Sequence, residues 1–410
     1  MESIIREQYL IRIRPYYDSD LIKVITGIRR CGKSIILNQI INEIKTKGVD
    51  EDRIIYLDLE GISGRDITDR RSLEDYISQR IKKDDKYYIF IDEIQNLPEF
   101  EIAIASIRVS FNSSLFVTGS NSKLLSGKLQ DRLTGRAKEF EIYPFTYSEY
   151  LEYKKINNIP LSNDDFKDYL TFGGLPQRFN ENNDVEVRKY LIGLYDSIIK
   201  KDVFDNHIRV NKNVFKQVAK YVLSTSGRLF SALSVAKGIK KNATNKEVKS
   251  FSATINNYAD YLKECYLILE CEPFYLKGKE RLNGSRKFYA IDVGLRNALG
   301  NVLDLDDTFA LEGIIHNELL YRGYEVKYGK LRDGEIDFVA IKNNKKCFIQ
   351  VAYKIDTEEV RTREYGAFKN IKDGSPRFVF SLDEFDSSNN GITHINIVDF
   401  LLNKVDISLS

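Results

Sequence analysis

The sequence contains no tryptophan, one methionine, three histidines and four cysteines, and its net charge is only +2. The cysteines form no C-x-x-C pair and the histidines are scattered along the chain. This spacing argues against a zinc site or a disulfide framework, and it indicates a reduced, cytoplasmic protein. Because the net charge is small, any affinity for nucleic acid has to come from local basic patches.

Long apolar runs are absent too. None approaches the roughly 18 residues that a membrane span needs, and the charged N-terminal stretch lacks the apolar core of a secretory signal. We therefore expect no membrane association. The 410 residues, 42% hydrophobic and 30% charged, suit a globular protein of two or three domains.

Three regions differ in pattern. Residues 1–150 alternate helical segments with short β-rich runs, which predicts an α/β domain with a buried parallel sheet. Residues 151–300 are mostly helical and end in a hairpin around Asn283-Gly284, an arrangement that resembles a winged helix. Residues 301–410 read as a helix, three strands, a helix and two strands, which predicts a second α/β domain. The β-rich runs of the first region lie at 23–26, 53–59, 87–92, 114–119 and 139–145.

A phosphate-binding loop is predicted between the first strand and the first long helix. Residues 27–34 read Gly-Ile-Arg-Arg-Cys-Gly-Lys-Ser, which matches G-x-x-x-x-G-K-[ST]. In such a loop backbone N–H groups and the helix dipole bind phosphate, Lys33 reaches the β- and γ-phosphates, and Ser34 ligates Mg²⁺. The side chains of Arg29 and Arg30 are expected to face solvent or a partner. The expected ATP contacts are Gly27, Arg30, Cys31, Gly32, Lys33, Ser34, Ile35, Ser120 and Asn121.

Two acids end the strand at 87–92. Asp92 is predicted to hold the water shell of the metal, and Glu93 to polarise the attacking water. Taken alone, two acids at a strand end also fit a merely solvated terminus, so the upstream loop is what favours a site. The next strand ends at Ser120 and Asn121, either of which could position the water or contact the γ-phosphate.

Arginines often neutralise the charge that develops on the transferred phosphoryl group. Arg132 and Arg136, just before the fifth strand, are the candidates for this role, with ordinary surface charge as the alternative.

Together, the segments 24–34, 89–95, 118–125, 133–150 and 172–176 resemble a family of bacterial and archaeal AAA-like ATPases. The resemblance covers nearly the whole chain. It implies ATP binding and hydrolysis by a P-loop NTPase domain of AAA/RecA-like fold, followed by a winged-helix region and a nuclease-like domain. Gly173, Gly174 and Pro176 match a hallmark of that family.

The last region is similar to the PD-(D/E)XK nuclease fold, whose chemistry needs two carboxylates for Mg²⁺ and a lysine. Glu318 and Asp337 are the matching acids, but Gln350 stands where a Glu is usual and Ala352 where the lysine belongs. Lys354 could be a displaced lysine on the same strand face. We therefore favour a degenerate domain that does not cut.

Two basic patches are candidates for DNA contacts in the winged-helix region. One lies at a turn between helices and the other on the presumed wing, and lysines that simply coat the surface are the alternative. The candidates are Lys237, Lys240, Lys241, Lys249, Arg281 and Arg286.

The sequence therefore predicts a Mg²⁺-dependent ATPase that couples nucleotide state to movement of the later domains, most plausibly on double-stranded DNA. One alternative is a STAND-like regulatory ATP switch that controls association with a protein partner, without nucleic acid. Another is an active Mg²⁺-dependent nuclease. An oligomer is compatible with each.

Overall fold

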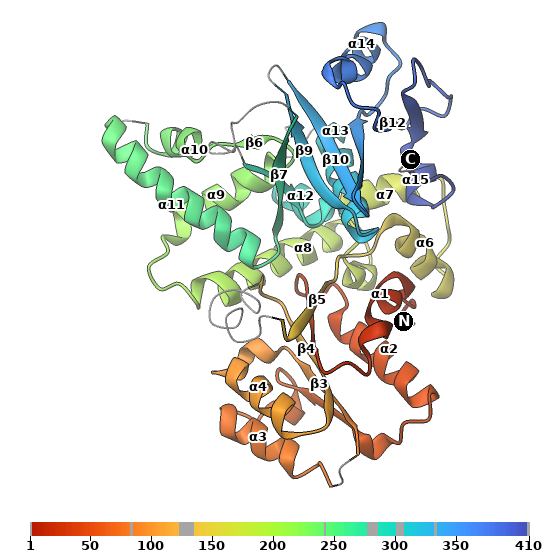
Figure 1. The fold of residues 1–410 in the computed structure, drawn as a ribbon. Helices are drawn as coiled ribbons and strands as arrows, with labels where there is room; N and C mark the ends of the chain where they lie inside the picture. Colours follow the sequence, from red (N-terminus) through yellow and green to blue (C-terminus); the bar gives the residue numbers. More distant parts are fainter. Residues whose placement is uncertain are drawn as a thin grey trace. The chain divides into compact units, whose positions relative to one another are not determined.

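The structure is a computed structural model of the chain, and it describes residues 2–82, 85–122, 135–241, 243–276, 286–300, 307–331 and 334–407. The chain divides into two compact units (Figure 1). The first unit comprises Met1–Pro144 and Glu264–Tyr266, and the second comprises Phe145–Lys263 and Leu267–Ser410. Apart from Glu264–Tyr266, the predicted regions 151–300 and 301–410 thus lie within one unit.

The first unit is built on a five-stranded parallel sheet in the order β2-β3-β4-β1-β5. Helices α3 and α4 lie on one side of this sheet and α1 and α2 on the other (Figure 1). This arrangement confirms the predicted P-loop NTPase fold of AAA/RecA-like type. The elements are β1 (Ile22–Thr26), β2 (Ile54–Asp58), β3 (Tyr87–Asp92), β4 (Ser113–Gly119), β5 (Ala137–Glu141), α1 (Glu7–Ile13), α2 (Lys33–Thr46), α3 (Arg70–Ser78) and α4 (Phe100–Ser110).

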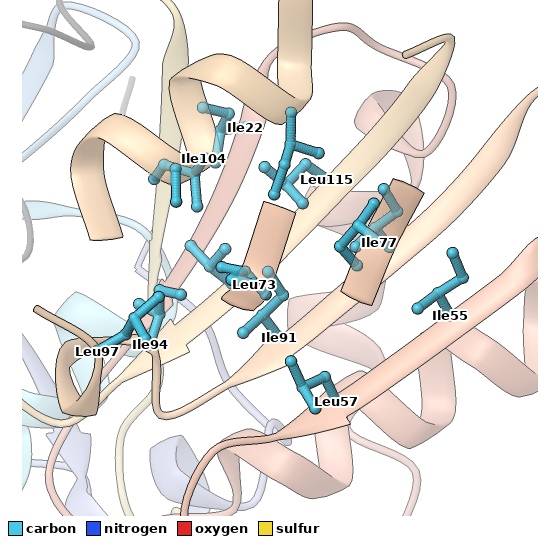
Figure 2. Close-up of a cluster of buried hydrophobic side chains, with 14 of the residues drawn as sticks. Ile22, Ile55, Leu57, Leu73, Ile77, Ile91, Ile94, Leu97, Ile104 and Leu115 are labelled. Atoms are coloured by element: carbon cyan, nitrogen blue, oxygen red, sulfur yellow. The ribbon is translucent and has the colours of Figure 1, made fainter. Parts of the chain in front are cut away.

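Both faces of the sheet are buried, which is why the central strands are almost continuously apolar. On one face, Leu73 from α3 and Ile104 from α4 pack in a cluster with Ile91 and Leu115 from the strands (Figure 2). On the other face the rings of Phe90 and Phe116 are stacked with their centroids 4.6 Å apart. This packing fixes the carboxyl ends of β1, β3 and β4 relative to one another.

The second unit contains one mixed eight-stranded sheet in the order β13-β12-β11-β10-β9-β7-β8-β6. Its elements are α6 (Tyr147–Ile156), α7 (Asp165–Phe172), α8 (Asp184–Ile198), α9 (Lys212–Ser224), β6 (Leu229–Phe230), α10 (Ala232–Ile239), α11 (Asn245–Glu264), β7 (Ile268–Tyr275), β8 (Arg286–Ala290), α12 (Val293–Leu299), α13 (Asp307–Tyr321), β9 (Glu325–Lys330), β10 (Glu335–Lys342), β11 (Lys345–Val351), α14 (Glu358–Gly366), β12 (Arg377–Ser381), β13 (Thr393–Asn396) and α15 (Ile397–Leu401).

Strand β7 joins the two halves of this sheet. Its first half, Ile268–Cys271, pairs antiparallel with β8, and its second half, Glu272–Tyr275, pairs parallel with β9. The strands of the predicted hairpin and those of the last α/β region therefore form one continuous sheet.

The glycines of the segment 172–176 allow close approach of backbones. A Cβ atom on Gly174 would lie 2.0 Å from the carbonyl oxygen of Phe145, and the Gly174 N–H donates to Asp292 at 2.7 Å. Asp292 also accepts from the Leu295 N–H at the start of α12. The end of α7 thus packs directly against the start of α12, which explains why this turn requires glycine.

Among the described helices, none is long and apolar enough to cross a membrane. All four cysteines are buried thiols outside any disulfide.

Candidate functional site

The loop between β1 and α2 forms an anion-binding cradle. Gly27, Arg30 and Gly32 have φ angles of +141°, +68° and +104°, which turns the backbone sharply around the loop. The first hydrogen bond of α2 runs from Ile36 N–H to the Gly32 carbonyl, so the N–H groups of the first helical residues have no partner within the helix. Such groups, together with the helix dipole, bind phosphate.

Lys33 lies at the start of α2 with 3% of its surface exposed. Its Nζ donates to the carbonyl oxygens of Gly27 (3.1 Å) and Ile28 (3.2 Å), so it closes over the loop. The same Nζ lies 3.5 Å from Glu93 Oε1. The lysine and the acid predicted to act on one nucleotide are therefore in direct contact.

Asp92 ends β3 and is buried, with 3% exposure. Its carboxylate accepts hydrogen bonds from the Thr118 hydroxyl and from the Tyr56 hydroxyl, the latter at 3.1 Å. Sequence patterns did not indicate Thr118 or Tyr56. The only available signal was their position on β4 and β2, the two strands that flank β3.

Glu93 has a left-handed backbone with φ +52°, a conformation that few residues other than glycine adopt. Its N–H donates to Thr118 Oγ1 at 2.9 Å, and its carboxylate accepts from the Gln95 amide, which also contacts Ser120 Oγ at 3.2 Å. Burial opposes ionisation of Glu93, but the charge of Lys33 and the bond from Gln95 outweigh it and lower the pKa. Glu93 is thus held as a carboxylate.

The other predicted contacts surround these groups. Cys31, Ser120 and Asn121 are buried, Ser34 is half-buried, and Ile35 is exposed on the first turn of α2. The Arg30 side chain is exposed. Arg29, by contrast, is largely buried and lies 3.6 Å from Glu60, so it does not simply face solvent.

The structure does not bring Arg136 to this cradle. Arg136 precedes β5, and its carbonyl accepts from the Ile22 N–H at the start of β1, whereas the cradle follows the end of β1 at Thr26. Five residues of parallel strand separate the two edges, a distance of roughly 16 Å. Arg132 lies outside the described residues.

The residues fit ATP with Mg²⁺ in the donors that they offer. The cradle supplies N–H groups and an ammonium for phosphate, and Ser34 and Asp92 supply oxygens of the kind that Mg²⁺ prefers. Within the described ranges, no group of three His, Cys, Asp or Glu side chains could hold a metal by itself. A cation bound through one or two protein oxygens and substrate phosphates agrees with this.

In the second unit, a cavity of about 610 Å³ gathers some of the predicted nuclease residues. Asp337 and Gln350 line it: the Asp337 N–H donates to Gln350 Oε1 at 2.8 Å, and Gln350 Nε2 donates to Glu364 at 3.0 Å. The helix acid beside them is Glu312, and the buried Lys287 ammonium lies 3.6 Å from Glu312 and 3.2 Å from Glu335. Burial raises the pKa of Asp337 to about 6.

Two residues predicted for that site lie elsewhere. Glu318 is six positions further along α13 than Glu312, and residues six apart face different sides of a helix. Glu318 therefore points away from Asp337, and it pairs with Arg322 at 2.7 Å. Lys354 follows the end of β11 at Val351 and is exposed, so it does not continue that strand face.

The candidate DNA contacts divide into two sets. Lys237, Lys240, Lys241 and Lys249 are exposed on α10, α11 and the turn between them. The Arg286 guanidinium is engaged by Glu270 (2.9 Å) and Asp260 (2.5 Å), so its charge is already neutralised. Arg281 lies outside the described residues.

Comparisons with known proteins agree with the geometry of the first unit. Residues 19–151 match a family model described as an AAA domain, and residues 163–307 match one described as a domain of unknown function. The parallel sheet, the cradle and the family model together define an AAA-type ATPase domain that binds nucleotide.

Relatives match over most of the chain. An uncharacterized protein of Haemophilus influenzae is 31% identical over 402 residues, covering 97% of this chain and 98% of that protein. Uncharacterized protein MJ1544 of Methanocaldococcus jannaschii is 30% identical over 367 residues, covering 86% and 79%. The chain belongs to the same family as these proteins.

Solved structures align with much of the chain at low identity and low TM-score. The ORC1 protein of Aeropyrum pernix, solved in complex with DNA, aligns with 73% of this chain and 93% of its own, at 13% identity and a TM-score of 0.31. Cdc6p of Pyrobaculum aerophilum aligns with 76% and 93%, at 10% identity and a TM-score of 0.30.

Proposed function

We propose that this protein is a Mg²⁺-dependent ATPase whose nucleotide state moves a DNA-binding second unit. The observation that carries the proposal is the meeting of Lys33, Asp92 and Glu93, with 3.5 Å between the Lys33 ammonium and the Glu93 carboxylate. A lysine in a phosphate cradle, a strand-end aspartate and an adjacent glutamate are the groups that phosphoryl transfer to water needs.

The residues of this site have separate proposed roles in ATP hydrolysis. The cradle N–H groups and Lys33 bind the β- and γ-phosphates, and a γ-phosphate competes with Glu93 for the Lys33 ammonium. Glu93, freed from that ion pair and still held by Gln95, accepts a proton from the attacking water. Ser34, and Asp92 through a water molecule, would hold Mg²⁺, which would supply positive charge for the phosphates. Arg136 precedes β5, at the end of the strands opposite the cradle. We therefore propose that it contacts the nucleotide bound to another copy of the protein.

The proposed partner of the second unit is duplex DNA. The order α9-β6-α10-α11-β7-β8 is the one expected of a winged helix, which supports this proposal. Exposed lysines lie on α10, on α11 and in the turn between them. Engagement of Arg286 by two carboxylates favours the second candidate, a regulatory switch that binds a protein. Strong salt dependence of DNA binding would support the first candidate, and salt-insensitive or absent binding the second.

We further propose that the second-unit cavity does not cut nucleic acid. Both ends of the Gln350 amide are engaged, and the Lys287 ammonium neutralises the acids at the position where a cation would act. Supercoiled plasmid incubated with the protein and Mg²⁺ should stay uncut. Nicking that disappears in Asp337→Ala would overturn this proposal.

Phosphate release from ATP by wild type, Lys33→Ala and Glu93→Gln, with and without duplex DNA, tests the ATPase. We expect Lys33→Ala to lose ATP binding and Glu93→Gln to bind ATP but release phosphate about 10²–10⁴-fold more slowly. Lys45→Ala, on the exposed side of the same helix and paired with Glu51, is the matched control and should behave as wild type. Tight binding without release by wild type under either condition would favour the switch.

A further inference from the structure

Arg6 is a buried arginine that ties the phosphate cradle to the end of the first unit. Only 1% of its surface is exposed. Its Nη1 donates to the carbonyl oxygens of Cys31 (3.1 Å) and Tyr143 (2.9 Å), and its Nη2 donates to that of Pro144 (3.4 Å). The guanidinium also lies over the Tyr9 ring, 4.6 Å from its centroid.

The contact with Cys31 orients the cradle. The carbonyl of Cys31 and the N–H of Gly32 belong to one planar trans peptide unit, in which the two bonds point in opposite directions. While Arg6 holds the carbonyl on the outside of the loop, the Gly32 N–H is turned to the inside, where phosphate binds. A glycine at φ +104° has easy alternatives, so the peptide needs such an external restraint.

The other contacts lie where the chain leaves the first unit. Pro144 is the last residue of its first segment, and the second unit begins at Phe145. The Tyr143 N–H donates to the Tyr9 hydroxyl at 3.0 Å. Two side chains of the N-terminal segment, Arg6 and Tyr9, therefore bind the backbone at residues 143–144, where the chain leaves the first unit (the chain exit). One guanidinium thus joins the cradle to the exit of the chain.

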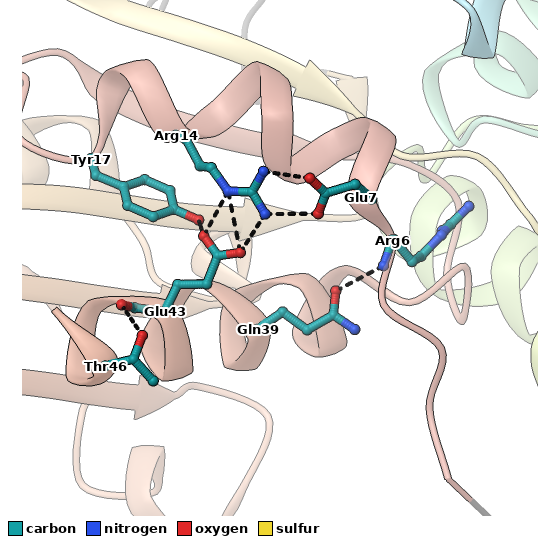
Figure 3. Close-up of polar contacts among 7 residues, drawn as sticks. All are labelled: Arg6, Glu7, Arg14, Tyr17, Gln39, Glu43 and Thr46. Atoms are coloured by element: carbon teal, nitrogen blue, oxygen red, sulfur yellow. Dashed lines mark hydrogen bonds and ion pairs between the residues drawn. The ribbon is translucent and has the colours of Figure 1, made fainter. Parts of the chain in front are cut away.

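The N-terminal segment is itself fixed on α2 (Figure 3). Gln39 accepts from the Arg6 N–H at 3.2 Å and donates to the Ile4 carbonyl at 2.6 Å. Further along, Arg14 joins Glu7 of α1 to Glu43 of α2. The backbone of Arg6 is therefore held on α2 by Gln39, independently of the Arg14 contacts.

We propose that Arg6 is a positioning residue for the ATPase: it sets the Gly32 peptide for phosphate binding and couples that peptide to the chain exit at Pro144. The inference rests on the proposed ATP site. This positioning role requires an arginine at residue 6, because the guanidinium presents several donors in a rigid fork and can bind three carbonyl oxygens at once. A lysine ammonium would reach fewer of them.

The test compares Arg6→Ala, Arg6→Lys and Arg14→Ala in the full-length protein. Arg14→Ala is the matched control, since it removes an arginine between α1 and α2 that does not contact the cradle. We expect Arg6→Ala to raise the Kd and the KM for ATP at least about tenfold with little change in kcat, and Arg6→Lys to be intermediate. Arg14→Ala should leave both constants within about twofold of wild type.

A purely structural role for Arg6 would lower the active fraction, and hence the apparent kcat, at unchanged KM. That result, or equal loss of affinity in Arg14→Ala, would overturn the inference. Failure of the proposed function is distinct, because wild type itself would then bind no ATP, or would bind it without releasing phosphate.

If the Arg6 variants do not fold, hydrogen exchange of the wild-type protein tests the coupling without a substitution. Addition of ADP with Mg²⁺ should slow exchange both in residues 28–33 and in residues 143–146. Slowing confined to the cradle would overturn the coupling.

Discussion

At the scale of single residues, Gly27 is the position in the cradle least able to change. Its φ of +141° lies in a region open essentially to glycine, and a Cβ atom would lie 2.2 Å from the Ile142 carbonyl oxygen. We expect Gly27→Ala to lower the free energy of unfolding by roughly 2–4 kcal/mol and to abolish ATP binding. Urea unfolding and a titration with fluorescent ATP measure both effects.

Gly48→Ala is the control for Gly27→Ala. Gly48 has φ +87° but no atom within 4 Å of an added Cβ, so the change should cost only about 1–2 kcal/mol and leave ATP binding intact. Equal effects of the two substitutions would contradict the role of the close approach to Ile142.

Lys23 predicts a dependence of stability on pH. It is fully buried on β1, donates to the Ser19 carbonyl (3.0 Å) and to Ser114 Oγ (2.7 Å), and burial lowers its pKa to about 7. In the unfolded chain a lysine has a pKa near 10.4, so between these values the unfolded state binds more protons and stability rises with pH. The rise should be roughly 1–2 kcal/mol from pH 7 to 8.5.

Urea unfolding of Lys23→Met at the two pH values checks this prediction. The variant should lack the rise that wild type has, while Lys138→Met, which removes an exposed lysine from β5, should retain it. Parallel pH profiles for wild type and Lys23→Met would refute the assignment to Lys23.

Which residues of the site the sequence can predict depends on what defines them. Lys33 and Asp92 follow from local patterns, a loop motif and a strand end. Tyr56, Thr118 and Gln95 depend on strand order and side-chain direction, which no local pattern carries. Glu312 illustrates the same limit: α13 contains several acids, and only its packing decides which of them meets Asp337.

At the scale of elements, helices α10 and α11 carry the basic surface that the DNA hypothesis needs. The triple change Lys240→Glu, Lys241→Glu and Lys249→Glu should weaken binding to duplex DNA at low salt. It should also flatten the dependence of log K on log salt by about 0.9 for each phosphate that the protein no longer neutralises. Fluorescence anisotropy at several salt concentrations measures the slope.

The control is a second triple variant that has the same net charge as the first. Lys167→Glu, Lys189→Glu and Lys404→Glu reverse three exposed lysines elsewhere in the second unit. Equal weakening of DNA binding in both triple variants would mean that overall charge, and not the surface of α10 and α11, determines DNA affinity.

Elements were predictable where periodicity was strong. All five strands of the first sheet were expected. Burial on both faces makes the inner strands β1, β3 and β4 nearly continuous apolar runs, and the partly exposed edge strands β2 and β5 lie in short β-rich runs. The two-residue strand β6 was missed, since Leu229 and Phe230 are too short for a pattern. β11 ends at Val351, earlier than its apolar run suggests, because the chain turns where Ile355 N–H bonds to Asp383.

At the scale of the whole molecule, the sequence predicted three regions, but pairing between distant strands joins two of them. β7 and β9 are separated by about fifty residues, and their register, from Glu272 opposite Lys327 to Tyr275 opposite Lys330, cannot be read from either segment. Only the tertiary fold brings these edges together.

The joined sheet predicts that residues 145–300 and 307–410 are not independent folding units. Tyr289 on β8 stacks on His316 at 4.4 Å and lies 5.5 Å from Phe338, both from the C-terminal part. Lys287 is buried against Glu312 and Glu335, and leaving such a charge without its partners costs roughly 3–5 kcal/mol. Separation of the two parts would therefore expose an open sheet edge and leave the Lys287 ammonium without its carboxylate partners.

A protease site introduced between residues 300 and 307 tests this prediction. After cleavage the two fragments should co-elute in native size-exclusion chromatography and separate only in urea, because the β7–β9 pairing and the Tyr289 stack persist without the covalent link. A C-terminal fragment that elutes alone and still melts cooperatively would mean that it is a separate domain. Nucleotide-driven movement would then be free to occur within the second unit, whereas co-elution restricts it to the unit as a whole.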